Sequence, residues 1–192
     1  TTRLVGSEMC IRDSRGAEVV NFDDRSWNVV STPHTVELMP AEGSGCRNYQ
    51  GPAWYRKHFV LPAETKGQRV VLHFEAAMGK QILYLNGKRI QEHLGGYLPF
   101  TLDLTANGVQ AGDSCLLAVF TDNSDDKSYP PGKRQYTLDF AYHGGIYRDV
   151  WMIAKSPVAI TDAIDSQTVG GGGVFIHFDK ISDCLLYTSP SP

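Results

Sequence analysis

Residues 144–151 read Gly-Gly-Ile-Tyr-Arg-Asp-Val-Trp, a stretch that joins a glycine pair and two adjacent charges to the start of an apolar run. The glycine pair permits a tight or left-handed backbone step, or the close approach of another group. The apolar run 150–153 predicts a strand that enters a core. A carboxylate held where a loop becomes a strand is well placed to bind a polar ligand, which makes Asp149 the first candidate. The alternative is an ordinary strand start with a solvated ion pair, because lone charges at strand ends are usually exposed.

Short strands separated by turns account for the rest of the chain. Apolar or alternating segments predict strands at residues 69–75, 81–85, 88–90, 100–104 and 114–120. Asn86-Gly87 between two of them is a strong signal for a two-residue hairpin. With 19 glycines and 10 prolines, the chain offers no convincing helix of any length. Several short strands at this spacing predict an all-β sandwich.

The composition limits the class of protein. The chain has 192 residues, 42% hydrophobic and 20% charged, which suits one globular domain and a fragment of another. Its net charge of −3 argues mildly against nucleic acid or an anionic membrane as a main partner. No apolar stretch is long enough to span a bilayer. The start of the chain shows no signal peptide, and because the true start can lie elsewhere the compartment is left open.

The four cysteines do not predict a metal site or a disulfide framework. None forms a CxxC pair, and no histidine stands at zinc-site spacing beside them. Cys115 lies in an apolar run and is expected to be a buried thiol. Cys46 lies in a loop rich in glycine and serine and is expected to be exposed.

An ordered set of motifs carries a family resemblance. Together with residues 144–151, the segments in question are Trp54–Phe59, Leu72–Ala76, Tyr84–Lys88, His93–Phe100 and Leu117–Ser124. In this order they resemble the N-terminal sugar-binding domain of glycoside hydrolase family 2, the β-galactosidase, β-glucuronidase and β-mannosidase group. The resemblance implies a jelly-roll, galactose-binding-domain-like sandwich, followed by the truncated start of an immunoglobulin-like sandwich.

The chain divides into four parts on this view. Residues 15–155 are the expected jelly-roll domain, and 156–181 are the start of the next domain, with strands predicted at 158–162 and 173–178. Because its partner sheet is missing, this second part is expected to pack poorly. Residues 1–14 and 182–192 do not match the family and are similar to translated sequencing-adapter tails. The alternative for both ends is irregular but genuine termini.

The resemblance also implies which residues would meet a sugar. In the family's β-galactosidases, the aspartate of the Arg-Asp pair reaches the active site and accepts hydrogen bonds from sugar hydroxyls, and Asp149 matches it. Arg148 is expected to hold carboxylates or loop carbonyls in place. In the β-glucuronidases an aspartate at an offset similar to that of Asp139 lies near the sugar, although a loop-capping turn is the alternative for Asp139. The polar loop 123–134 would reach toward the active site or a subunit interface.

Aromatic side chains offer a different possibility. Tyr97, Tyr129 and Tyr136 could form an independent carbohydrate platform, because sugar faces stack on aromatic rings. The alternative is that they fill the edges of the sandwich.

The catalytic machinery of the family is absent from this sequence. Retaining glycosidases use two carboxylates about 5–5.5 Å apart. In family 2 both are glutamates of a later (β/α)8 barrel, which needs about 200 residues or more. The chain alone is therefore predicted to be inactive, with no cofactor of its own. Some β-galactosidases of the family hold sodium or magnesium near the active site, partly with residues of other domains.

The resemblance implies a parent enzyme and its partners. The expected parent is a retaining hydrolase of terminal β-D-galactosides, because the Arg-Asp sequence favours it over a β-glucuronidase. Its partners would be a β-glycoside or oligosaccharide substrate, the later domains of the same chain and further copies of itself. The alternatives are a parent with β-glucuronidase or β-mannosidase activity, a free-standing carbohydrate-binding module and a purely structural domain.

Overall fold

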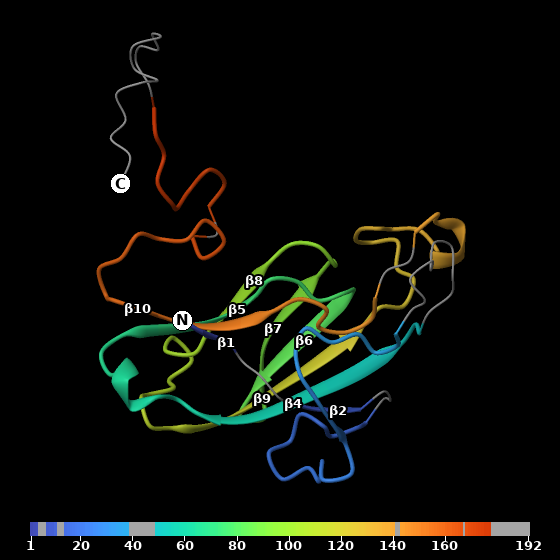
Figure 1. Ribbon diagram of the computed structural model, residues 1–192, viewed down its shortest axis with the longest axis horizontal. Helices are drawn as coiled ribbons and strands as arrows, with labels where there is room; N and C mark the ends of the chain where they lie inside the picture. Colours follow the sequence, from blue (N-terminus) through green and yellow to red (C-terminus); the bar gives the residue numbers. More distant parts are fainter. Residues whose placement is uncertain (4–6, 11–13, 39–48, 141–142, 167, 178–192) are drawn as a thin grey trace. The chain divides into compact units, whose positions relative to one another are not determined.

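The computed structural model describes residues 1–3, 7–10, 14–38, 49–140, 143–166 and 168–177. The chain divides into two units, residues 1–159 and 160–192. Every strand among the described residues lies in the first unit, in two antiparallel sheets (Figure 1).

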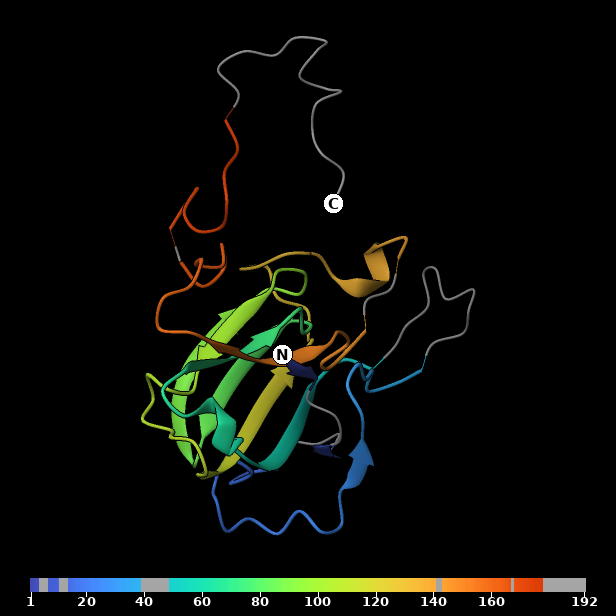
Figure 2. The same cartoon turned by 60° about the vertical axis from the view of Figure 1, so that its left-hand side comes forward.

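The larger sheet has the strand order β3-β2-β4-β9-β6-β7. Its strands are β2 (Ser7–Cys10), β3 (Asn28–Val30), β4 (Pro52–Val60), β6 (Lys80–Leu85), β7 (Lys88–Leu94) and β9 (Ser114–Asp122). At its centre β4 and β9 pair along their whole length, from Pro52↔Asp122 to Val60↔Ser114. Figure 2 shows β9, in yellow, between β4 and β6.

The smaller sheet has the order β1-β10-β5-β8. Its strands are β1 (Thr2–Arg3), β5 (Arg69–Phe74), β8 (Phe100–Asp103) and β10 (Val150–Lys155). The strands predicted between residues 54 and 153 are therefore confirmed, and β7 continues beyond its predicted end. The all-β sandwich is confirmed with them.

The hairpin between β6 and β7 forms at the predicted turn. Asn86 and Gly87 have φ angles of 51° and 82°. Two successive positive φ values are typical of the type I′ turn, whose twist matches that of the flanking strands. The Asn86 side chain also accepts a hydrogen bond of 2.8 Å from the backbone N–H of Leu116, which fastens the turn to β9.

The core lies between the two sheets. Alternate residues of β6 are buried, as expected for a strand with one face covered. The side chains that fill the core from both sheets include Leu72, Phe74, Leu83, Leu85, Leu102, Leu117, Val119 and Val150. Each such side chain contributes about 1.5–3 kcal/mol through burial, and together they hold the sheets face to face.

The outer face of β4 is also covered, which the sequence did not indicate. Arg56 on this face is completely buried. Its guanidinium donates to the Asp24 carboxylate at 2.7 Å and to the carbonyls of Ala17 and Val19. These bonds fasten the segment from Ala17 to Asp24 over the sheet.

The first residues of the chain take part in both sheets. β1 pairs with β10, and β2 lies between β3 and β4. Met9 of β2 is 3% exposed and belongs to the core. The structure thus gives this segment a place in the sandwich, and its origin as a non-native tail stays a prediction.

Two predictions about the second part of the chain have different outcomes. No strand forms among the described residues from 156 onward, so the strands predicted at 158–162 and 173–178 are absent there. The prediction of poor packing is confirmed, since Val158, Phe175 and Ile176 are 91%, 73% and 76% exposed. Both outcomes have one cause: an isolated apolar strand without a partner sheet gains too little burial to form.

Helix is scarce, as predicted. The described residues form two three-residue 3-10 helices, η1 (Ala63–Thr65) and η2 (Gln135–Thr137). In this part of the chain no helix has the length and apolar character needed to cross a bilayer. Cys115 is buried, as expected, at 2% exposure, while Cys46 and Cys184 lie outside the described residues.

Candidate functional site

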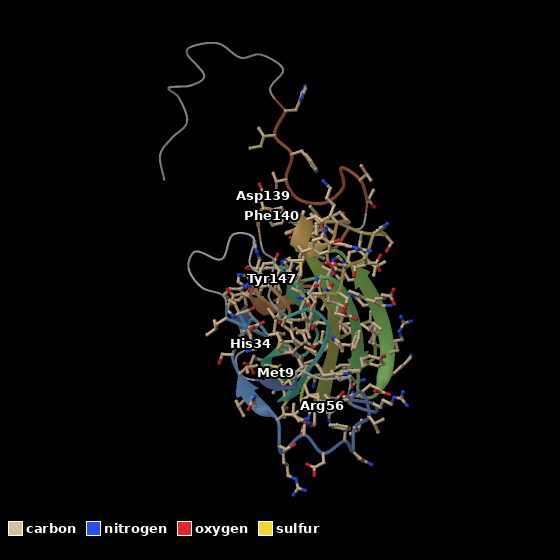
Figure 3. The ribbon with its side chains drawn as sticks, turned by 90° about the vertical axis from the view of Figure 1, so that its right-hand side faces the viewer. Met9, His34, Arg56, Asp139, Phe140 and Tyr147 are labelled. Carbon is tan, nitrogen blue, oxygen red and sulfur yellow. The ribbon has the colours of Figure 1, made fainter. Side chains whose placement is uncertain are left out.

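The sequence-predicted site residues gather at one end of the sandwich. The pairings Pro52↔Asp122 and Phe74↔Phe100 show that β4 and β8 begin where β9 and β5 end. β10 begins there too, at Val150 opposite Phe74. We call this edge the loop end, because the segments 31–38, 49–51, 75–79, 95–99, 123–140 and 143–149 all meet it. Figure 3 shows Asp139, Phe140 and Tyr147 above Arg56, which lies at the middle of β4, opposite Ala118.

The segment 144–149 is fixed to the rest of the loop end by backbone hydrogen bonds on two sides. On one side, the N–H groups of His34 and Val36 donate to the carbonyls of Ile146 and Gly144 at 2.8 and 3.0 Å. On the other side, the N–H groups of Met78 and Glu75 donate to the carbonyls of Gly145 and Asp149, both at 3.0 Å. The segment is therefore a braced strap and not an open loop.

Asp149 stands at the last residue of this strap, immediately before β10. Its side chain is partly buried, and its Oδ1 atom is shut off from solvent. Nearby on the same sheet end, the Trp151 ring N–H donates to the Glu75 carboxylate at 2.9 Å. The carboxylate of Asp149 is thus carried by backbone that is bonded on both sides, as a preorganised acceptor needs.

Arg148 and Tyr147 form the outer part of the strap. Arg148 is exposed, and its guanidinium carbon lies 6.0 Å from the centre of the Tyr147 ring, a cation–π distance. The Tyr147 hydroxyl donates to the carbonyl of Gly96 in the neighbouring loop. Partial burial raises the pKa of the Tyr147 phenol, so it remains a donor at neutral pH. The role predicted for Arg148, holding carboxylates in place, stays a prediction.

Asp139 has a different setting. It is exposed, and it follows η2 in the long loop after β9. The loop is held by Asp125, whose carboxylate accepts from the Gln135 N–H at 2.9 Å and from the Gln50 side chain at 2.8 Å. Phe140 beside Asp139 is 45% exposed. Both aspartates therefore lie in segments of the loop end, Asp149 on the braced strap and Asp139 on the long loop.

The tyrosines proposed as a platform differ in exposure. Tyr97 and Tyr136 are 46% and 58% exposed, and Tyr129 is partly buried. Burial and nearby aspartates raise the pKa of Tyr129 to about 12. A separate cavity of about 640 Å³ lies at the opposite end of the sandwich, lined by residues that include Thr65, Gln110 and Pro157. It contains none of the predicted site residues.

Three residues that lie beside the strap were not singled out as site residues by the sequence. Tyr55 and His34 are joined by a hydrogen bond of 3.0 Å between the Tyr55 hydroxyl and His34 Nδ1. Asn123, 2% exposed, donates to the Tyr49 carbonyl at 2.7 Å and accepts from the Gly51 N–H at 2.9 Å. A polar residue that follows a long apolar strand, as Asn123 does, is the signal that could have identified it.

No metal centre is built from the part of the chain that the structure describes, where no group of three or more His, Cys, Asp or Glu side chains could hold an ion. His143, immediately before the strap, interacts with the Thr35 hydroxyl at 3.2 Å through its Nδ1 atom.

Comparison with known proteins agrees with this fold. The family model described as "Glycosyl hydrolases family 2, sugar binding domain" matches residues 17–157. A β-galactosidase of Thermoanaerobacter pseudethanolicus is 35% identical over 177 residues, which cover 92% of this chain and 22% of that protein. A β-glucuronidase of Formosa agariphila is 30% identical over 183 residues, covering 87% of this chain and 18% of that protein.

A solved structure is similar as well. The β-glucuronidase 2 of Bacteroides uniformis, solved with a covalently bound cyclophellitol-6-carboxylate aziridine, matches with a TM-score of 0.68 and 30% identity. The match covers 80% of this chain and 18% of that structure. The chain thus spans about a fifth of the length of the relatives that it matches.

Proposed function

The chain belongs to glycoside hydrolase family 2, and from that membership we propose that it is the sugar-binding domain of a larger retaining β-galactosidase. In this proposal the domain walls one side of the active-site pocket, and Asp149 accepts hydrogen bonds from hydroxyls of the terminal sugar. The observation that carries the proposal is the position of Asp149 at the end of a braced strap. A carboxylate there is a preorganised hydrogen-bond acceptor, because the backbone that carries it is held in place by bonds to other segments.

The chemistry of bond cleavage is assigned to the rest of the parent enzyme. Retaining hydrolysis needs an acid/base carboxyl group and a nucleophilic carboxylate about 5–5.5 Å apart. The proposal places both on the later barrel and gives this domain the tasks of binding and orienting the sugar. Orientation lowers the barrier because it brings the sugar into a reactive geometry before cleavage begins.

A second candidate is a parent that hydrolyses β-glucuronides. Two observations favour it: relatives named β-glucuronidases match over most of this chain, and Asp139 occupies the offset that the family resemblance links to a glucuronate. The two candidates share the fold, the strap and Asp149, and they differ in the sugar that the complete enzyme accepts.

The test begins with the gene. Sequencing from the source DNA past Lys180 should show a downstream barrel with two glutamates on different strands. The complete enzyme should then hydrolyse an aryl β-galactoside faster than an aryl β-glucuronide, and the opposite preference would select the second candidate. A stop codon soon after Pro192 in genomic DNA would overturn the proposal and favour a free-standing carbohydrate-binding module.

The role of Asp149 is tested in the same enzyme. Asp149→Asn should lower kcat/KM about ten- to a hundredfold, the range for losing a hydrogen bond to a charged group. The matched control is Asp113→Asn at the other end of the sandwich, where the carboxylate accepts from the Gln110 N–H at 2.8 Å. Equal kinetics for the two variants would show that the domain is only structural.

A further inference from the structure

A buried tyrosine hydroxyl lies directly beneath the strap. Tyr55 is on β4, 2% exposed, and its ring meets that of His34 edge to face at 5.8 Å. A Cβ atom added to Gly145 would lie 2.1 Å from the Tyr55 hydroxyl. Only glycine therefore fits at position 145 while the hydroxyl is in place, and the φ of +94° there favours glycine as well.

Three groups close a small hydrogen-bonded ring at this point. The backbone of Ile146 is hydrogen-bonded to the Tyr55 hydroxyl, the hydroxyl bonds His34 Nδ1 at 3.0 Å, and the His34 N–H donates to the Ile146 carbonyl at 2.8 Å. Burial raises the pKa of Tyr55, so the phenol keeps its proton. The hydroxyl is then the donor to Nδ1, and the neutral imidazole carries its own proton on Nε2.

The state of His34 follows from its surroundings. Burial lowers its pKa, which favours the neutral ring that the Tyr55 bond needs. The titratable groups in contact around His34 are Tyr55 on β4 and, through Thr35, His143 immediately before the strap. The remaining contact is the backbone of Ile146, which carries no charge.

The hydrogen-bonded ring includes Ile146, and only two residues separate Ile146 from Asp149. The strap is held at Ile146 by His34 and Tyr55 and at Asp149 by the Glu75 N–H, while Tyr147 between them is held by Gly96. With both ends fixed, a shift at Ile146 must be taken up at Tyr147 and Arg148 or passed on to Asp149.

We propose that Tyr55 and His34 are positioning residues that set where the Asp149 carboxylate meets the sugar. The inference rests on the proposed function, in which Asp149 is the sugar ligand. Tyr55 and His34 touch no substrate themselves. They act through the backbone of the strap, so their effect on turnover depends on the presence of the Asp149 carboxylate.

The first experiment uses the 192-residue chain. Tyr55→Phe removes the hydroxyl and leaves the ring, and Tyr84→Phe on the same sheet is the matched control. NMR should show a changed amide shift and faster hydrogen exchange at Ile146 in the first variant, with the Asp149 amide shifted as well. Unchanged signals at both residues would overturn the inference.

The second experiment uses kinetics of the complete enzyme. Tyr55→Phe should lower kcat/KM about two- to tenfold, as the loss of one neutral hydrogen bond does. In an Asp149→Asn background the same change should have almost no further effect, because the carboxylate that it positions is gone. Additive losses, or a loss no larger than that of Tyr84→Phe, would show a merely structural role. If Asp149→Asn alone has no effect, the result contradicts the proposed function, in which Asp149 binds the sugar, and not the positioning of the strap by Tyr55 and His34.

A third pair of variants keeps the test open if Tyr55→Phe does not fold. His34→Asn places an amide oxygen two bonds from Cβ, where Nδ1 stands, whereas His34→Leu removes the acceptor. His34→Asn should lose less activity than His34→Leu. The unsubstituted enzyme should lose activity when acid protonates His34, and the asparagine variant should not show this loss because asparagine does not titrate. Equal losses in the two variants would overturn the role of His34.

Discussion

Replacing Gly145 by alanine tests whether the Tyr55 hydroxyl really sets the strap. The new Cβ would lie 2.1 Å from the hydroxyl oxygen, 3.1 Å from the ring carbon that bears it and 3.2 Å from a Val36 methyl. The φ of +94° adds strain that a side chain at this position cannot avoid.

The magnitude follows from three costs. Left-handed backbone at a residue with a Cβ costs about 1–2 kcal/mol. Overpacking of a filled site costs about 1–3 kcal/mol, and the tyrosine must also give up a hydrogen bond of about 0.5–1.5 kcal/mol. Gly145→Ala should therefore lower the free energy of unfolding by about 3–6 kcal/mol, a large share of the about 5–15 kcal/mol of a typical domain.

The assay is urea unfolding of the 192-residue chain, followed by the fluorescence of its 3 tryptophans. Gly108→Ala is the matched control, because Gly108 has a similar φ of +86° and nothing within 4 Å of an added Cβ. The control should show the strain alone, about 1–2 kcal/mol.

A double variant separates the strain from the clash. In a Tyr55→Phe background the hydroxyl is absent but the contacts of 3.1 and 3.2 Å remain, so Gly145→Ala should cost less than in the parent chain and still more than the Gly108 control. The reasoning is refuted if Gly145→Ala costs as little as the control in the parent chain. It is refuted equally if the cost is undiminished when the hydroxyl has been removed.

Three further results are expected. Arg56→Met should lower the free energy of unfolding by about 3–5 kcal/mol, because it leaves the Asp24 carboxylate and the backbone carbonyls without their buried donor. The control is Arg69→Met. It breaks the pair with Asp103, whose side chains are 41% and 20% exposed, and should cost less than about 1 kcal/mol. Burial lowers the pKa of His34 and His93 in the folded chain, so the unfolded chain binds more protons in acid. The contribution of these two histidines to the free energy of unfolding should be complete above about pH 6.5 and should be lost as the pH falls through their folded-state pKa values. Unfolding experiments at a series of pH values measure this loss. Amides in residues 158–166 should exchange within seconds to minutes, and uniform protection there would contradict the poor packing.

The strands could be predicted because their signals are local. Alternation in β6 and β8, the apolar run of β9 and the Asn86-Gly87 turn each depend on neighbouring residues only. β4 shows the limit of this reasoning. Four successive residues from Ala53 to Arg56 are buried, because the segment at Ala17–Asp24 covers the outer face of the sheet. An arginine in a strand is usually solvated, so its full burial depends on a long-range contact that no periodicity reveals.

The site could be predicted in part for the same reason. Asp149 is a candidate from the sequence because a carboxylate between a glycine pair and an apolar run is a local pattern, and its role in binding a sugar stays a prediction. Its supports are not local: Tyr55 lies 21 residues from His34, and both are far along the chain from the strap. The glycine pair was a sign of this contact, since Gly145 leaves the space that the hydroxyl fills, but the sequence could not show which side chain would fill it.

The two aspartates at the loop end contribute to binding in different ways if the proposed function holds. Asp149 is on backbone bonded from both sides, so a sugar that it binds orders little else, and its contribution should be similar for any terminal sugar with matching hydroxyls. Asp139 is exposed on a long loop that is held by the hydrogen bond between Asp125 and Gln135, so ordering it on ligand binding costs more conformational entropy. A residue on such a loop discriminates between ligands only if one ligand makes an added interaction that offsets the entropy lost when the loop is ordered. The preference between a galactoside and a glucuronide should therefore respond to Asp139, while binding of either sugar should respond to Asp149.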